Sequence, residues 1–221
     1  MSPVTVKENI EFARQQKDTL WHELMDPADA AIREDGRIAP IVAAREILHP
    51  LPDGFLLVDE APCANPFTQP MHRSTGGRQY FHNRGGGLGW GMPAAVAVSL
   101  ANDRAPVLCL VGDGSAMYSP QALWSAVHEG TPVVFVVLNN GEYGILKNFM
   151  INQPQYNSAR HGFIAMDICD PAVDFQSLAK SMGVEAISVT SHREISETVD
   201  AAIKAGKPCL IEIPVTGVAG N

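Results

Sequence analysis

The chain has 221 residues, a hydrophobic fraction of 46% and a formal net charge of −8. A chain of this length can bury one substantial core; the acidic balance without a basic stripe argues against a nucleic-acid partner, and the absence of roughly 18 consecutive apolar residues argues against a membrane span. The N-terminus lacks the apolar core of a signal peptide and the four cysteines form no CxxC pair, so we expect a cytoplasmic protein with reduced thiols.

The first part of the chain is expected to precede the main fold. Apolar residues recur at roughly helical spacing between residues 6 and 25, among them Ile10, Leu20 and Leu24, and a polar stretch follows up to Gly36. We interpret residues 1–36 as a helix and linker left from a preceding domain, and residues 37–221 as a second domain.

Strands and helices alternate through the second domain. Strands are predicted at 55–59, 79–82, 107–111, 133–138, 185–189 and 209–214, and helices at 93–101, 120–129, 175–182 and 193–205. The runs at 107–111 and 133–138 are almost continuously apolar, which suits strands covered on both faces. This pattern predicts an α/β fold with three layers: a doubly wound, mainly parallel six-stranded sheet between helices. Residues 152–170 show no clear periodicity and are a candidate mobile loop over the site.

Two polar groups follow neighbouring strands of this sheet. Gly112-Asp113-Gly114-Ser115 closes the strand at 107–111, and Asn139-Asn140 closes the strand at 133–138. The segment between them reads as a crossover whose helix has Ser119 as N-cap and Gly130 as its stop. Because right-handed crossovers place the carboxyl ends of parallel strands at one edge of the sheet, Asp113 and Asn140 are expected to face one pocket.

The donors at this edge are hard oxygens, which suit magnesium or calcium rather than zinc. Magnesium held by few protein oxygens usually completes its octahedron with phosphate oxygens and water. Gly112 and Gly114 allow close backbone approach, and the amides from Gly114 to Ser115 can receive an anion. The residues therefore predict a site for a metal-bound diphosphate. Loop capping at two strand ends and a flavodoxin-like or nucleotide-binding regulator are the alternatives.

These motifs carry a family resemblance. Gly112-Asp113-Gly114 and Asn139-Asn140, preceded by FHNRGGGLGWGMPAA at residues 81–95, resemble the signature of thiamine-diphosphate-dependent enzymes. The resemblance runs from about residue 36 to about residue 215. It is to the C-terminal, pyrophosphate-binding domain of the benzoylformate decarboxylase, pyruvate decarboxylase and acetolactate synthase group, most of all to the benzoylformate decarboxylase branch. It implies a thiamine-diphosphate-binding fold, with thiamine diphosphate and Mg²⁺ as cofactors.

The resemblance also implies roles for individual residues. The metal ligands are Asp113, Asn140 and the main-chain carbonyl of Glu142, so Glu142→Gln is expected to be mild. Leu88 and Gly86 match catalytic positions: Leu88 holds the cofactor bent, and the Gly86 carbonyl accepts from its pyrimidine amino group. The residues that match cofactor contacts are Glu60, Gly86, Leu88, Gly112, Gly114, Ser115, Tyr118, Tyr143 and Ile145, with Leu146 and Phe149 towards the substrate.

Two stretches depart from the family pattern. Where relatives often offer hydroxyl side chains to the diphosphate, this chain has Pro62 and Cys63. His82-Asn83-Arg84 is more polar than in relatives that bind aromatic 2-oxo acids, which is consistent with a different or more acidic substrate.

The resemblance implies that this chain is the C-terminal, cofactor-binding portion of a thiamine-diphosphate- and magnesium-dependent 2-oxo acid decarboxylase, a carbon–carbon lyase. The complete enzyme is expected to be a homo-oligomer. Its activity is expected to need a glutamate from an N-terminal, pyrimidine-binding domain or subunit. An acetolactate synthase-type carboligase portion, a beta-type subunit of a split decarboxylase, and a non-catalytic diphosphate-binding module are the alternatives.

Overall fold

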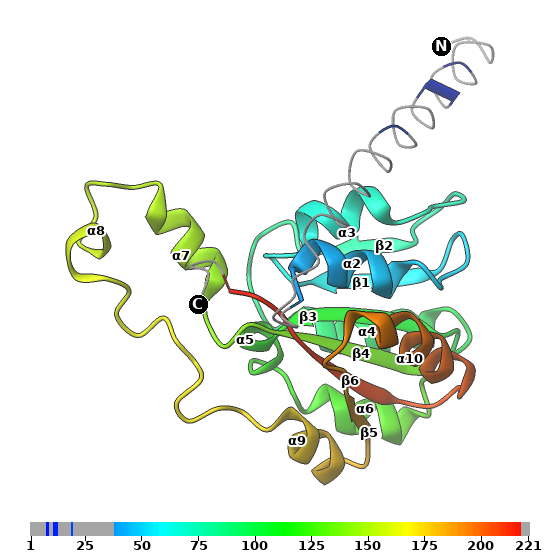
Figure 1. The fold of residues 1–221 in the computed structure, drawn as a ribbon. Coiled ribbons are helices and arrows are strands. Elements are labelled where there is room, and N and C mark those ends of the chain that lie inside the picture. Colours follow the sequence, from blue (N-terminus) through cyan, green and yellow to red (C-terminus); the bar gives the residue numbers. More distant parts are fainter. Residues whose placement is uncertain (1–7, 9–10, 13–18, 20–37, 218–221) are drawn as a thin grey trace.

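The computed structural model describes residues 8, 11–12, 19 and 38–217. Its centre is a six-stranded parallel sheet with the strand order β2-β1-β3-β4-β6-β5 (Figure 1). The strands are β1 (Leu56–Glu60), β2 (Tyr80–His82), β3 (Val107–Gly112), β4 (Val133–Asn139), β5 (Glu185–Ser188) and β6 (Cys209–Pro214). The predicted doubly wound α/β fold is confirmed, with a sheet that is wholly parallel. The helix and linker predicted for residues 1–36 lie outside the described residues, apart from four isolated positions.

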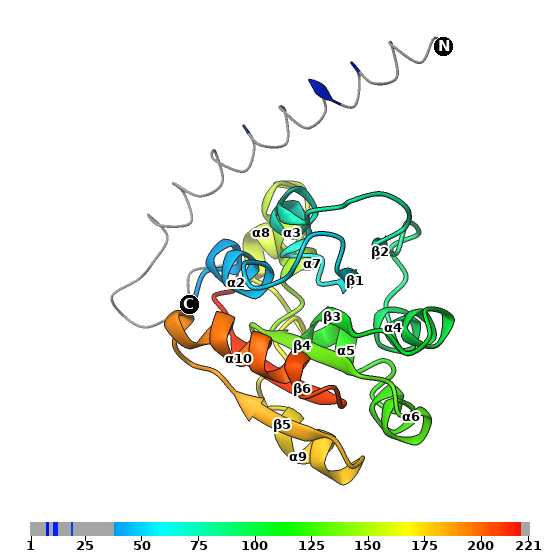
Figure 2. The same ribbon diagram turned by 90° about the vertical axis from the view of Figure 1, so that its right-hand side faces the viewer.

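Helices cover both faces of the sheet (Figure 2). One face carries α2 (Pro40–Leu48), α3 (Asn65–Met71) and α10 (His192–Lys204), and the other carries α4 (Gly91–Ala101), α6 (Ala122–Glu129) and α9 (Phe175–Ser181). Three further helices, α5 (Asp113–Ala116), α7 (Gly144–Ile151) and α8 (Ser158–His161), follow the carboxyl ends of β3 and β4. In the part of the chain that the structure describes, no helix combines the length and apolar character needed to cross a membrane.

The central strands are buried on both faces. Leu108 and Leu110 of β3 pack into the core beneath α2 and α10, whereas Val107, Cys109 and Val111 pack beneath α4 and α6. All five are fully buried, which explains why the strand reads as an uninterrupted apolar run. The register pairs Gly112 with Leu138, so β3 and β4 end at the same level and their following residues lie side by side.

The connection from β3 to β4 differs from the prediction at its start. Gly130 ends α6 in the left-handed conformation, with φ of 62°, as expected for a helix stop. Ser119, however, is not the N-cap. The N-cap is Gln121, and the Ser119 hydroxyl instead donates to the carbonyl of Gly89 at 2.9 Å. The chain first makes a turn in which the Ala122 amide bonds to the Ser119 carbonyl, so α6 begins later than the sequence suggested.

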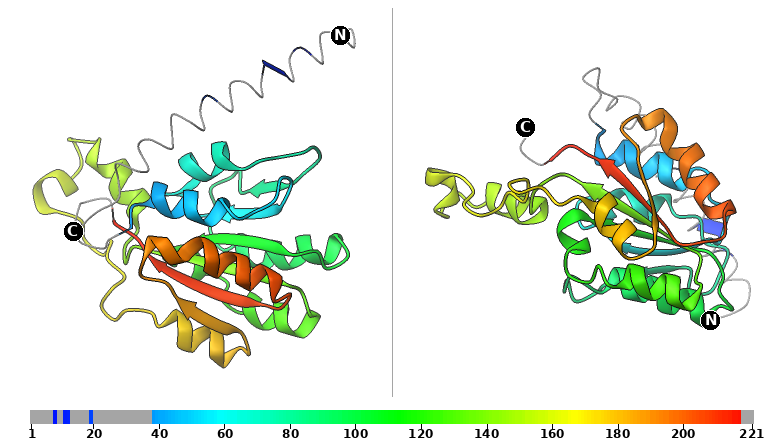
Figure 3. Two further views of the ribbon diagram at one scale, coloured as in Figure 1. Left: turned by 45° about the vertical axis from the view of Figure 1, so that its right-hand side comes forward. Right: turned by 90° about the horizontal axis from the view of Figure 1, so that it is seen from below.

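The chain makes an excursion after β4. It forms α7 and α8 away from the sheet and returns towards it before α9 (Figures 1 and 3). We call residues 139–143 the β4 turn and residues 163–168 the return segment. The two pair as a short antiparallel ladder, in which the Tyr143 amide donates to the Met166 carbonyl and the Ile168 amide to the Gly141 carbonyl, each at 2.8 Å. The predicted loop at 152–170 thus contains α8 and the whole return segment; its mobility stays a prediction.

The two ends of the described fold meet beside the β4 turn. Ile38 forms a parallel bridge with Val215, and the Thr216 amide donates to the Ile38 carbonyl at 2.9 Å. The Val215 amide in turn donates to the Asn139 carbonyl at 2.9 Å. The first and last residues of the described fold therefore lie next to the end of β4, at the carboxyl edge of the sheet.

Candidate functional site

A pocket lies at the carboxyl edge of the sheet, beyond β1, β3 and β4. Most of the predicted site residues line it: Leu88, Gly112, Asp113, Gly114, Ser115, Asn140, Glu142, Tyr143 and Ile145. The remaining lining is mostly apolar and was not predicted: Pro40, Ala61, Ala64, Leu138 and Val215, with Gly144 and the departures Pro62 and Cys63. One pocket therefore combines a polar floor at two strand ends with apolar walls, as a ligand with an anionic and an aromatic part requires.

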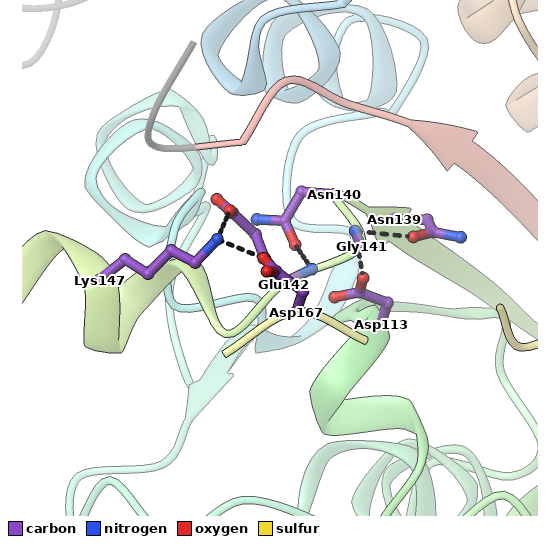
Figure 4. A network of polar contacts seen from close by, with 7 residues as sticks. All are labelled: Asp113, Asn139, Asn140, Gly141, Glu142, Lys147 and Asp167. Carbon is purple, nitrogen blue, oxygen red and sulfur yellow. Dashed lines mark hydrogen bonds and ion pairs between the residues drawn. The ribbon is translucent and has the colours of Figure 1, made fainter. Parts of the chain in front are cut away.

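Asp113 is fixed by the backbone around it. Its side chain is 4% exposed, and its two carboxylate oxygens accept from different amides: Oδ1 from Gly114 at 2.8 Å and Oδ2 from Gly141 at 2.7 Å (Figure 4). The Gly141 amide also lies 3.1 Å from Oδ1 of Asn139, whose Nδ2 donates to Glu212 at 2.8 Å. The carboxylate at the end of β3 is thus bonded directly to the β4 turn.

The β4 turn orients two further oxygens. The Glu142 amide donates to Oδ1 of Asn140 at 3.2 Å. Glu142 and Asp167 form the non-hydrogen-bonded pair of the ladder, so the main-chain N–H and carbonyl of Glu142 both point away from the return segment. The Asn140 amide oxygen and the Glu142 carbonyl therefore lie on the same side of the turn, in the pocket lining.

This set of oxygen donors fits a hard cation that also binds ligands from outside the protein. The described residues contain no group of three or more His, Cys, Asp or Glu side chains that could hold a metal ion. A cation at Asp113 would therefore combine one carboxylate, one amide oxygen and one carbonyl with oxygens from water or from a bound anion. Magnesium in phosphate-ester sites is held in this way.

Protonation of Asp113 is expected to compete with cation binding. Burial raises the pKa of Asp113 to about 6, against the lowering effect of the hydrogen bonds from Gly114 and Gly141. Below about pH 6 we expect Mg²⁺ affinity to fall about tenfold per pH unit, because proton and cation share the carboxylate. Titrations with Mg²⁺ between about pH 7.5 and about pH 5 measure this, and an affinity that does not change would contradict it.

The raised pKa of Asp113 also makes the free energy of unfolding of the cation-free chain depend on pH. The folded state binds the Asp113 proton more tightly than the unfolded state, whose pKa is near 3.8. The contribution of Asp113 to the free energy of unfolding is therefore fully present below that value and is lost as the pH rises through about 6.

Five predicted residues lie outside the lining: the exposed side chains Leu146 and Phe149 of α7, and Glu60, Gly86 and Tyr118. Glu60 was expected at the cofactor, yet this residue is only 3% exposed, and its carboxylate accepts from the amides of Gly89 at 2.6 Å, Trp90 at 3.2 Å and Gly91 at 2.5 Å. It holds the turn that starts α4, and with it the position of Leu88. There is no room for a side chain at Gly91, because a Cβ atom would lie 2.7 Å from Glu60.

Gly86 and Tyr118 flank this same turn. The Gly86 backbone has φ of 70°, and Asn83 clamps its neighbours by accepting from the Gly85 amide at 2.8 Å and donating to the Gly87 carbonyl. Tyr118 is 61% exposed and packs its Cβ against Gly89. Both residues are exposed and lie beside the turn that carries Leu88, but neither lines the pocket.

Two side chains at the site were missed or misjudged from the sequence. Lys147 of α7 is 3% exposed and bonded to the carboxylates of Glu142 and Asp167 (Figure 4). Glu142→Gln can therefore no longer be expected to be mild, because the Glu142 side chain has a buried cationic partner. The only sequence signal was one lysine within the apolar stretch GILKNFMI.

Cys63 lines the pocket but is not set up as a nucleophile. Burial, with the nearby carboxylates of Asp113 and Glu142, raises the pKa of its thiol to about 11. The thiol is therefore neutral at physiological pH and contributes an apolar surface.

Comparison with known proteins bears on this site. The family described as "Thiamine pyrophosphate enzyme, C-terminal TPP binding domain" matches residues 62–213. The benzoylformate decarboxylase of Pseudomonas aeruginosa is 39% identical over 137 residues, covering 61% of this chain and 24% of that protein. An acetolactate synthase of Arthrospira platensis is 30% identical over 209 residues, covering 92% of this chain and 34% of that protein.

Solved structures give the same match. The thiamine diphosphate-dependent 4-hydroxybenzoylformate decarboxylase of Rhodococcus jostii RHA1 superposes with a TM-score of 0.75 at 31% identity. The match covers 85% of this chain and 34% of that one. The benzoylformate decarboxylase of Polynucleobacter necessarius superposes with a TM-score of 0.71 at 29% identity, covering 79% and 32% of the two chains. This chain thus spans about a quarter to a third of the length of these relatives.

Proposed function

Because this chain belongs to the thiamine pyrophosphate enzymes and contains their C-terminal TPP binding domain, we propose that its pocket holds thiamine diphosphate through a Mg²⁺ ion. The observation that carries the proposal is the Asp113 carboxylate, buried at one strand end and bonded to the turn that presents Asn140 and the Glu142 carbonyl. These three oxygens would bind the cation. The diphosphate would lie against it and accept from the Ser115 amide, because the Gly114 amide already donates to Asp113.

The apolar half of the pocket would orient the rest of the cofactor. Leu88 and Ile145 both line the pocket, Leu88 from the glycine turn before α4 and Ile145 from α7. Leu88 would support the bent conformation and the Gly86 carbonyl would accept from the pyrimidine amino group. Tyr143, whose ring packs on Gly114, and Ile145 would keep water from the reacting face. The cofactor itself supplies the nucleophilic carbon and the electron sink for cleavage next to a carbonyl group.

The reaction we propose is decarboxylation of a 2-oxo acid. Support comes from the benzoylformate decarboxylase of P. aeruginosa and from the decarboxylase structures, whose matches cover 85% and 79% of this chain. A carboligase of the acetolactate synthase type is the second candidate, since the A. platensis enzyme aligns with more of the chain. In either case residues 37–221 would form the cofactor half of an active site within a homo-oligomer. A pyrimidine-binding domain or subunit would complete that site. The four free cysteines accord with a cytoplasmic location for it.

Calorimetric titration of the 221-residue chain with thiamine diphosphate tests the proposal. We expect binding at least about tenfold tighter with Mg²⁺ than with EDTA, because the diphosphate reaches Asp113 and Asn140 only through the cation. The titration is repeated with the N-terminal domain of a relative added, which would supply the other half of the site. Equal affinity with and without Mg²⁺, or no binding in either format, would reject the proposal. Binding without turnover in the reconstituted pair would favour a non-catalytic diphosphate-binding module.

A further inference from the structure

Lys147 is a buried cation whose partners come from two separate stretches of chain. Its Nζ donates to Oδ1 of Asp167 at 2.6 Å and to Oε2 of Glu142, and it lies 5.6 Å from the centre of the Phe163 ring. Glu142 belongs to the β4 turn, whereas Phe163 and Asp167 belong to the return segment. Lys147 thus joins the two ends of the excursion that carries α7 and α8 (Figure 4).

The backbone ladder by itself holds the two ends of this excursion together only weakly. Two hydrogen bonds join the β4 turn to the return segment, from Tyr143 to Met166 and from Ile168 to Gly141. The entropy of ordering the intervening residues opposes this closure. Charge-assisted contacts to both sides, buried at Glu142 and partly exposed at Asp167, add the strongest kind of hydrogen bond available to the chain.

The ladder is continuous with the proposed cation site. The Gly141 carbonyl accepts from Ile168 on one side, while the Gly141 amide donates to Asp113 on the other. The next residue, Glu142, directs its side chain to Lys147 and its amide to Asn140. The backbone orientation of Glu142 is therefore set by a contact to Lys147 at one end and a contact to Asn140 at the other.

We propose that Lys147 is a positioning residue for the cation site: it fastens the return segment to the β4 turn and holds the Glu142 side chain away from Asp113, so that the turn offers a carbonyl there. This inference rests on the proposed function. Without Lys147, the Glu142 carboxylate loses this charged contact in a buried place and reorients towards water or towards the pocket. Either movement displaces the carbonyl and releases the ladder.

Hydrogen exchange of the cofactor-free 221-residue chain tests the fastening directly. In Lys147→Met, which keeps most of the unbranched side chain and removes its charge, we expect the Tyr143 and Ile168 amides to exchange at least about tenfold faster. Lys147→Arg should stay near the wild type, because a guanidinium can serve both carboxylates. Lys204→Met is the matched control, since it removes an exposed lysine paired with Asp200 on α10; both amides should then keep their wild-type rates.

The second measurement is the Mg²⁺ concentration that half-saturates thiamine diphosphate binding. We expect it to rise at least about tenfold in Lys147→Met and to be restored in Lys147→Arg, which a packing role would not do, because arginine is bulkier than methionine. If Lys147→Met does not fold, Asp167→Asn replaces it, since Asp167 is exposed and its loss spares the core.

Wild-type exchange rates in Lys147→Met, or in Asp167→Asn when that variant is used, would overturn the inference even if the cofactor binds. Failure of the wild-type chain to bind the cofactor would count against the proposed function, while the exchange rates still decide the fastening.

Discussion

Asp113→Ala is expected to abolish Mg²⁺-dependent binding of thiamine diphosphate, with a loss of about 100-fold or more in affinity. The reason is charge. Asp113 and Glu142 are the two carboxylates in the pocket lining, and that of Glu142 is bonded to Lys147. Removing Asp113 leaves the proposed cation with neutral oxygens only. Calorimetry near pH 7.5 measures the effect, at a pH where Asp113 is ionised.

Asp113→Asn separates this charge effect from structural damage. The amide oxygen can still accept one of the two hydrogen bonds from Gly114 and Gly141, so the fold is disturbed less than in the alanine variant. We expect the same loss of Mg²⁺ dependence. Asp200→Ala, on α10 away from the pocket, is the control and should bind as the wild type does. An asparagine variant with wild-type Mg²⁺ dependence would remove Asp113 from the cation site.

Glu60→Ala is expected to lower the free energy of unfolding by about 3 kcal/mol, the largest stability effect that we predict at the site. Three amides, of Gly89, Trp90 and Gly91, lose a charged acceptor in a buried place. Each such bond contributes about 1.5–3 kcal/mol, and entering water recovers part of the total. Chemical denaturation monitored by circular dichroism measures the change.

Glu60→Gln is a sharper test, because glutamine has almost the same shape as glutamate and the change removes only the charge and one acceptor oxygen. Glutamine keeps one acceptor oxygen, but its NH₂ group would face an amide donor of the same turn. We expect a loss close to that of the alanine variant. The exposed Glu197 on α10 provides the control, and its replacement by alanine should change stability by less than about 0.5 kcal/mol. A loss under about 1 kcal/mol in both Glu60 variants would show that the turn does not depend on this carboxylate.

The fold could be predicted from the sequence because its signals are local or periodic. The apolar runs of β3 and β4 mark strands with two covered faces, and Gly130 marks the end of the crossover helix. These two features define a strand–helix–strand crossover, and a crossover of this kind places Asp113 and Asn140 at the same edge of the sheet. The register of β3 against β4 then brings the two strand ends level.

The parts that escaped prediction depend on contacts between distant residues. In the sequence, Glu60 looks like a polar strand end, because the turn at Gly89–Gly91 that donates to it is about 30 residues away. Ser119 likewise looks like a helix cap, because nothing in the sequence places the Gly89 carbonyl beside its hydroxyl. Lys147 looks like one exposed lysine on a short helix. Its burial becomes visible only when the return segment brings Asp167 back to the β4 turn. Side chains that satisfy remote backbone or remote charges leave no periodic pattern.

The pairing of Ile38 with Val215 has a consequence for how the pocket can be completed. Pro40 and Val215 both line the pocket, so the fold is entered and left at its mouth. Any polypeptide joined in front of Ile38 is tethered at that mouth, where a short linker gives an effective concentration of about a millimolar. A domain supplied as a separate chain must bind tightly enough to replace that tether. A domain that is covalently connected at this position can therefore complete the pocket even if its own affinity for this chain is low.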